Sequence, residues 1–148
     1  MARVSSGALI CDTSGLLDYL VSGASDHRAF RTVIDAARTR YVPGLVLAEL
    51  DYFLRAHRDA LRAFVDDMAR GAFTYAPITL DQIVRATEID RRYADLSLGL
   101  VDASVVALAD ELGIRRIATR DVRHFAAVRL ADGSALELAV IPTEPDRS

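Results

Sequence analysis

Four consecutive apolar residues at positions 8–11 are followed directly by an acid, Asp12. A strand without polar alternation is typical of a parallel sheet whose two faces are both covered by helices. Thr13 and Ser14 come next, and because apolar residues at helical spacing follow them, either hydroxyl is expected to cap a helix. The start of the chain therefore predicts a strand and a helix with Asp12 at their junction, where the positive end of the helix dipole favours an ionised carboxylate.

Short strands and amphipathic helices alternate along the rest of the chain. We expect further strands at residues 40–42, 73–78, 116–119 and 136–141, and helices at about 26–37, 46–54, 57–70, 79–93 and 99–112. Thr79 and Gln82 form a capping box at the start of one helix, and Gly113 can end the last one. This alternation predicts an α/β fold, a three-layer α/β/α sandwich around a mostly parallel central sheet.

One domain accounts for the whole chain in this interpretation. The 148 residues are 51% hydrophobic, and we expect residues 1–148 to form a single domain with loose tails at 1–7 and 143–148. The chain has no run of about 18 apolar residues and no signal segment, so we expect a cytoplasmic protein without membrane contact. The single cysteine, Cys11, lies in the first apolar run and is expected to be a buried, inert thiol.

Four acids are predicted to meet at one edge of this sheet. Asp12 follows the first strand, and Glu49 lies in the helix after the second. Asp102 lies in the first turn of a later helix, and Asp121 follows the fourth strand. The carboxyl ends of parallel strands and the helices that begin there share one edge, where such proteins bind ligands. Glu49 and Asp51 lie at opposite edges of one buried helix face, so spacing alone does not choose between them.

Carboxylates packed together without a cation repel one another and raise one another's pKa values. A hard divalent ion relieves this repulsion, and a ligand set of oxygen atoms favours Mg²⁺ or Mn²⁺ over Zn²⁺. Such a site binds phosphate groups, lowers the pKa of a bound water and stabilises both oxygens of an in-line displacement. The alternative is that acids at these positions serve only as helix caps and partners of helix dipoles.

The composition and the absent motifs exclude several enzyme classes. All 18 basic residues are Arg, and without Lys neither a P-loop nor a Schiff-base mechanism is possible. The chain has no nucleophile-elbow, dinucleotide-binding or Cys-x-x-Cys motif, so covalent catalysis and dinucleotide binding have no support. The formal net charge of -3 argues mildly against a nucleic-acid partner.

The remaining polar side chains indicate no second site. Arg120 and Arg123 lie near Asp121, and their guanidinium groups are expected either to bind phosphate or to pair with acids. Other acids, such as Asp18, are expected to face solvent. The three histidines, among them His124, are expected to have surface or structural roles, and no aromatic stacking platform is evident.

Four short motifs follow one another in a specific order. They occupy residues 10–14, 42–50, 100–104 and 117–121, and His124 and Phe125 follow the last one. In order and spacing they resemble the PIN-domain ribonucleases, and most closely the VapC toxins of bacterial toxin–antitoxin pairs. The resemblance covers about residues 9–142, nearly the whole chain.

This resemblance implies a metal-dependent endoribonuclease, a hydrolase in which Mg²⁺ or Mn²⁺ activates water for cleavage of RNA phosphodiester bonds. It assigns catalytic and metal-binding roles to four residues, Asp12, Glu49, Asp102 and Asp121. Asp12 and Asp102 would be the central ligands. It also implies water or phosphate contacts for Ser14 and Thr119. Members of this family usually form homodimers and are silenced by a cognate VapB-type antitoxin that covers the active site.

Two alternatives share this fold. The chain could be a catalytically silent PIN-like binding module whose acids contribute only to stability, or a related nuclease with a housekeeping or DNA substrate. A phosphatase or phosphoacceptor domain fits less well, because Ser14 stands where such sites have a second acid and the chain has no Lys.

Overall fold

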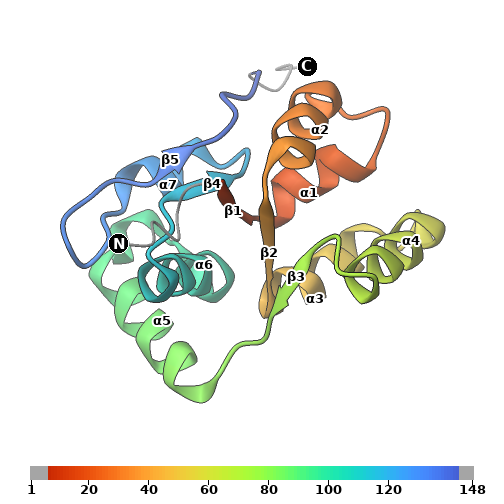
Figure 1. The fold of residues 1–148 in the computed structure, drawn as a ribbon. Helices are drawn as coiled ribbons and strands as arrows, with labels where there is room; N and C mark the ends of the chain where they lie inside the picture. Colours follow the sequence, from red (N-terminus) through yellow and green to blue (C-terminus); the bar gives the residue numbers. More distant parts are fainter. Residues whose placement is uncertain (1–6, 144–148) are drawn as a thin grey trace.

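Five parallel strands form the centre of the structure, a computed structural model that describes residues 7–143 (Figure 1). The strands are β1 (Ala8–Cys11), β2 (Thr39–Pro43), β3 (Thr74–Ala76), β4 (Arg116–Ala118) and β5 (Glu137–Leu138). Their order in the sheet is β3-β2-β1-β4-β5, and every pairing between neighbours is parallel. The predicted parallel sheet is confirmed.

Seven α-helices and one short 3₁₀ helix connect the strands within residues 7–143. They are α1 (Thr13–Leu20), α2 (His27–Ala36), α3 (Gly44–Phe53), α4 (Arg58–Ala69), α5 (Leu80–Arg92), η1 (Ala94–Leu96), α6 (Gly99–Leu112) and α7 (Val122–Ala127). In Figure 1, α5 and α6 lie on one side of the sheet and α1 and α2 on the other. This arrangement confirms the predicted three-layer α/β/α sandwich. No helix between residues 7 and 143 has the length and hydropathy needed to span a membrane.

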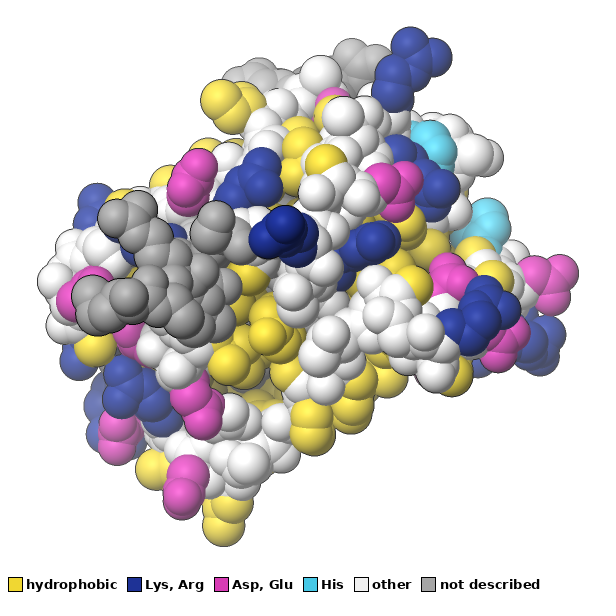
Figure 2. All heavy atoms as spheres, in the orientation of Figure 1, with side chains coloured by type: hydrophobic (Ala, Val, Ile, Leu, Met, Phe, Trp, Pro, Cys, Tyr) yellow, Lys and Arg dark blue, Asp and Glu magenta, His cyan; other side chains and the backbone are white. Residues whose placement is uncertain are grey.

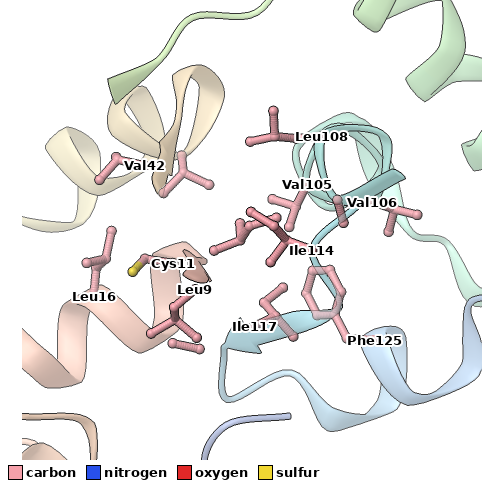
Figure 3. Packing of buried hydrophobic residues seen from close by; sticks show 14 of the residues in the cluster. Leu9, Cys11, Leu16, Val42, Val105, Val106, Leu108, Ile114, Ile117 and Phe125 are labelled. Carbon is pink, nitrogen blue, oxygen red and sulfur yellow. The ribbon is translucent and has the colours of Figure 1, made fainter. Parts of the chain in front are cut away.

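β1 lies in the middle of the sheet and forms the centre of the hydrophobic core. Leu9, Ile10 and Cys11 are at most 1% exposed. Figure 3 shows Leu9 and Cys11 among buried side chains of α1, α6 and β4, which explains why this strand has no polar position. Burial raises the pKa of the Cys11 thiol to about 12, so the expected buried and unreactive cysteine is confirmed.

The predicted helix ends are partly confirmed. The capping box forms, because the Gln82 amide donates to Thr79 Oγ1 at 3.2 Å and the Thr79 amide donates to Gln82 Oε1 at 2.9 Å. Gly113, with a φ of 66°, ends α6. The capping role expected for the hydroxyls of Thr13 or Ser14 is wrong, since α1 begins at Thr13 and has no side-chain cap. The Ser14 hydroxyl instead reaches across to β4.

Arg120 joins three segments through ion pairs. Its Nη1 lies 2.7 Å from Oδ2 of Asp18 and also contacts Asp26. Its Nη2 donates to the carbonyl of Thr143 at 3.0 Å, and the amide of Thr143 donates to Asp26 at 3.0 Å. The expectation that Asp18 faces solvent is wrong, because Asp18 is buried against this guanidinium. Thr143 is likewise bonded rather than loose, and the other residues of the expected tails, except Gly7, lie outside the described residues.

The chain adds strands on opposite sides of β1. From β1 it runs outward to β2 and β3, and it later returns to add β4 and β5 on the other side. The register pairs Cys11 with Ala118, and the amide of Asp12 donates to the carbonyl of Ala118 at 3.0 Å. In open α/β sheets, ligands bind beyond the carboxyl ends of the strands at such a switch point. Asp12 lies at this point.

Gly15 allows the first turn of α1 to approach the end of β4. A Cβ atom added at Gly15 would lie 2.4 Å from the carbonyl oxygen of Ala118 and 2.8 Å from its carbonyl carbon. Because the two segments are so close, the hydroxyl oxygens of Ser14 and Thr119 lie 3.2 Å apart. A side chain at position 15 would have to push α1 away from β4.

We expect Gly15→Ala to lower the free energy of unfolding by about 2–3 kcal/mol, since overpacking against backbone outweighs the roughly 1 kcal/mol that alanine gains over glycine in a helix. Gly23→Ala is the matched control, because a Cβ atom there has no neighbour within 4 Å. Urea denaturation of both variants measures the difference. Equal stabilities would contradict the close approach of α1 to β4.

Candidate active site

The four acids singled out from the sequence line one hollow of about 240 Å³ at the switch point. The residues that line it are Asp12, Thr13, Ser14, Leu17, Glu49, Phe53, Asp102 and Asp121. They belong to the junction of β1 with α1, to α3, to the first turn of α6 and to the residue before α7. The fold therefore brings these carboxylates together, and no arginine lines the hollow.

Larger hollows lie elsewhere on the described surface, and in two of them an acid is paired with an arginine. Arg85 lies 3.1 Å from Asp110 in a hollow of about 570 Å³ beside α5 and α6. Asp26, in a hollow of about 650 Å³ beside α2, pairs with Arg120. The smaller hollow with four acids is different, because its carboxylates have no arginine to neutralise them. We therefore take it as the candidate active site.

The carboxylate of Asp12 is buried, and only one of its two oxygen atoms accepts hydrogen bonds. Its Oδ2 accepts hydrogen bonds from the hydroxyls of Thr119, at 2.7 Å, and Ser14, at 3.3 Å. Its Oδ1 is buried and has no hydrogen-bond partner among residues 7–143. Burial and the neighbouring charge of Asp102 raise the pKa of Asp12 to about 7. A buried carboxylate oxygen without a donor is costly, and a hard cation bound to it would remove that cost.

His124 joins two of the acids. Its Nδ1 lies 2.7 Å from Oδ2 of Asp102 and 2.9 Å from Oδ2 of Asp121. Burial, together with the charges of Asp121 and Glu49, raises the pKa of Asp102, and the hydrogen bond from His124 opposes this rise. The hydrogen bond with Asp102 raises the pKa of His124. The imidazole therefore bridges Asp102 and Asp121.

The sequence analysis did not include His124 among the candidate site residues. Asp121 ends the loop before α7, and its Oδ1 accepts a hydrogen bond from the His124 amide at 3.1 Å. α7 has only six residues, too few for an apolar repeat, and the sequence analysis did not predict it. The spacing of three residues is the signal that could have found His124, because residues three apart in a first helical turn face each other.

The donor atoms of Asp102, Asp121 and His124 lie within 4.8 Å of one another, close enough to hold one metal ion. This group therefore places a histidine beside two of the carboxylates that line the hollow. These three groups fit a divalent cation, whereas Asp12 and Glu49 line the same hollow but lie outside this group.

α3 places Glu49, and not Asp51, in the hollow. Glu49 is half-buried and lines the site. Asp51 is exposed and lies 2.8 Å from Nη1 of Arg58, at the start of α4. The structure thus decides between two acids that helical spacing leaves equivalent.

The hydroxyls of Ser14 and Thr119 connect the ends of β1 and β4. Besides their bonds to Asp12, Thr119 Oγ1 accepts the amide of Asp121 at 3.0 Å, and Ser14 Oγ accepts the amide of Arg120 at 2.8 Å. These hydrogen bonds hold Asp12 and Asp121 at fixed positions. A water or phosphate contact of either hydroxyl stays a prediction.

The two arginines near Asp121 differ in their surroundings. The guanidinium of Arg120 is bound by Asp18 and Asp26, which favours a structural role for this side chain. Arg123 is exposed on α7 and forms no ion pair with a carboxylate of residues 7–143. Arg123 is therefore the one of the pair that remains available for a phosphate group.

The stability of the metal-free protein should depend on pH through Asp12. Because its pKa rises from 3.8 to about 7 on folding, the native state binds a proton more tightly than the unfolded chain, and stability falls as pH rises through this range. We expect Asp12→Asn to raise the melting temperature at pH 8 and to have little effect at pH 4. The gain at pH 8 should be about 2 kcal/mol or more, given about 1.4 kcal/mol per pKa unit. Equal effects at both pH values would contradict this assignment.

Binding of a divalent metal should stabilise the folded state. We expect millimolar Mn²⁺ to raise the melting temperature of the wild-type protein by several degrees over that in EDTA, since a ligand that binds only the folded state stabilises it. Asp12→Asn should lose most of this rise, whereas Asp51→Asn, an exposed acid on the same helix as Glu49, should keep it. An equal rise in all three proteins would indicate that the metal binds elsewhere.

Comparisons with known proteins agree with this geometry. Residues 9–130 match the PIN domain family. Ribonuclease VapC26 of Mycobacterium tuberculosis is 39% identical over 137 residues, which are 90% of this chain and 100% of that protein.

Two solved structures share the fold. The M. tuberculosis toxin VapC20, described as cleaving the sarcin–ricin loop, matches with a TM-score of 0.73 and 20% identity over 80% of this chain and 94% of its own. A toxin–antitoxin complex from Klebsiella pneumoniae contains a chain that matches with a TM-score of 0.64 and 22% identity, over 81% of this chain and 92% of its own. Since the family match spans most of the chain and the curated relative aligns along its whole length, this chain belongs to the PIN-domain family and, within it, to the VapC ribonucleases.

Proposed function

We propose that this chain is the toxin of a toxin–antitoxin pair, an endoribonuclease that hydrolyses RNA phosphodiester bonds with Mg²⁺ or Mn²⁺. The observation that supports it most is the buried, unpartnered Oδ1 of Asp12 in a hollow lined by three further carboxylates. We interpret this oxygen as a ligand atom for a cation, since hard divalent cations bind carboxylate oxygens. Purely stabilising acids would have hydrogen-bond donors on both oxygens.

Each acid has a distinct part in this proposal. Asp12 and Asp102 are the central ligands, and Glu49 and Asp121 complete or tune the site. A divalent cation bound there would neutralise charge at the scissile phosphate and lower the pKa of the attacking water. Hydrogen bonds to Oδ2 keep the Asp12 carboxylate in one orientation. His124 orients Asp102 and Asp121, because its Nδ1 lies close to a carboxylate oxygen of each.

The partners follow from the same family membership. A toxin of this type needs a cognate antitoxin, for which we propose a VapB-type protein, and the Klebsiella pneumoniae structure is a toxin–antitoxin complex. We extend the proposal to a homodimer that acts on RNA in the cytoplasm. Arg123, exposed beside Asp121, is the side chain we assign to phosphate contact, with Ser14, Thr119 and Arg120 as further candidates.

The two alternatives make different demands on the site. A silent PIN-like module would not need four carboxylates around an unsatisfied oxygen. A housekeeping or DNA-directed nuclease could use the same acids, but the curated relative that aligns along its whole length is named a ribonuclease. The substrate is therefore the point that experiment must test.

Purified, antitoxin-free protein should cleave total cellular RNA into discrete fragments with Mg²⁺ or Mn²⁺ and lose this activity in EDTA. Asp12→Asn should reduce cleavage by at least about 100-fold, because it removes a ligand rather than a supporting group. Asp51→Asn is the control and should cleave as the wild-type protein does. Primer extension maps the positions of cleavage in the RNA. A single-stranded DNA of matched sequence is incubated in parallel, and its products are separated on a gel.

Three outcomes would overturn parts of the proposal. Cleavage that survives chelation would exclude the metal mechanism. Equal cleavage of DNA would favour the related nuclease. A folded protein that neither binds Mn²⁺ nor cuts RNA would favour the silent module.

A further inference from the structure

Phe53 is an exposed aromatic side chain in the wall of the active-site hollow. Although it lines the hollow with the four acids, Phe53 remains 52% exposed and takes no part in the hydrophobic core. The sequence analysis did not anticipate an exposed aromatic ring at this hollow. Phe53 ends α3, although its spacing from Val46 and Leu50 in the sequence predicts a place on the core face of that helix.

Helical geometry places Phe53 beside Glu49. The two residues are four apart in α3, so they lie on the same face, with Phe53 one turn further along. Leu17 of α1 lines the same hollow and is only partly buried. The hollow thus combines carboxylates with two apolar walls, and this combination suits a ligand that has both phosphate and flat apolar parts.

A second aromatic ring and a cation extend this wall. Tyr52 is 56% exposed, and its ring meets Phe53 edge to face, with centroids 5.4 Å apart and planes at 80°. The guanidinium carbon of Arg55 lies 4.2 Å from the centroid of Tyr52. Arg55 forms no ion pair with a carboxylate of residues 7–143. We call Phe53, Tyr52 and Arg55 the aromatic strip.

On the face drawn in Figure 2, arginines and acids are interspersed, and no broad basic field is present. The aromatic strip suits a nucleic acid because it offers a contact that does not depend on such a field. With a net charge of -3, phosphate attraction is local, and further affinity must come from the bases. Base stacking on aromatic rings provides it, and only unpaired bases have a free face. Arg55 at the far end of the strip suits the phosphate of a neighbouring nucleotide.

We propose that Phe53 stacks on an unpaired base next to the scissile phosphate, and that Tyr52 and Arg55 hold the adjoining nucleotide. The inference rests on the proposed ribonuclease function and adds to it the side chain that holds an unpaired base beside the cut site. Phe53 is then a substrate-positioning residue, which acts on binding and on the choice of the cut site. The contact is to the face of the base, so an aromatic residue is required there, but a phenylalanine is not.

The chain contains no Trp, so Phe53→Trp creates a single fluorescent reporter at the site. Val84→Trp is the matched control, because Val84 is 51% exposed on α5, away from the hollow. Each variant also carries Asp102→Asn, which prevents cleavage. Each is titrated in buffer with Ca²⁺ with a 12-nucleotide mixed-sequence RNA, once as a single strand and once as a duplex. We expect the single strand to quench the Trp at position 53, the duplex to quench it much less, and the Trp at position 84 to remain unchanged.

Phe53→Ala in the same background should raise the dissociation constant for the single strand about 10-fold, the loss expected from one base–aromatic stack. Phe53→Trp should restore the affinity to within about twofold of the wild-type residue. The positions of cleavage by active protein with Phe53→Ala, mapped on total RNA, should become less selective. Circular dichroism and melting temperature check that each variant is folded.

Several results would overturn this inference. One such result is a Phe53→Ala protein that binds the single strand as tightly as the protein with Phe53. Another is an equal loss of affinity for the single strand and the duplex. Normal RNA binding by a Phe53→Ala protein that no longer forms a complex with its antitoxin would assign the aromatic strip to that protein instead. If the wild-type protein cleaves RNA in any of these cases, the ribonuclease function stands and the stacking role fails. If the wild-type protein neither binds nor cleaves RNA, both fail.

Discussion

The arrangement of this domain depends on the burial of one carboxylate, that of Asp12, between β1 and β4. Because Asp12 is only 3% exposed, its Oδ2 depends on protein groups for hydrogen bonds, and Thr119 and Ser14 provide the hydroxyls. Those hydroxyls are in reach because Gly15 allows α1 to lie against the end of β4. The Oδ1 atom is left without a donor. A local cost of this kind is typical of a functional site, where stability of the empty protein is given up for ligand binding.

Paired charges surround this site, and unpaired charges lie within it. Outside the hollow, Arg120 holds Asp18 and Asp26, and Arg58 holds Asp51, so these acids contribute to the frame of the domain. Inside it, no arginine of residues 7–143 lines the hollow, and Asp102 and Asp121 contact the imidazole of His124. The field of the hollow is therefore strongly negative and favours a cation. An acidic net charge is thus compatible with a phosphate-containing substrate, because a bound cation reverses the local charge.

The candidate site could be predicted in part, and each gap has a physical reason. Asp12 and Asp121 follow buried strands, a position that the chain itself reveals. His124 was missed because α7 is too short to show a helical period. Phe53 was assigned to the core because its spacing from Val46 and Leu50 suits the buried stripe, yet α3 ends there and the ring is exposed. Periodicity shows which residues lie on the same face of a helix, but it does not show whether another segment covers that face.

The sequence by itself determined the order of strands and helices, the parallel sheet and the edge at which the acids gather, because these follow from local apolar patterns and from the rule that parallel strands end together. Only the tertiary structure decided which groups touch. It places Glu49 rather than Asp51 in the hollow, and it pairs Arg120 with buried acids. It also directs the Ser14 hydroxyl to the end of β4 and not to the start of α1. These choices depend on distances between segments far apart in the chain, and a one-dimensional pattern contains no such distances.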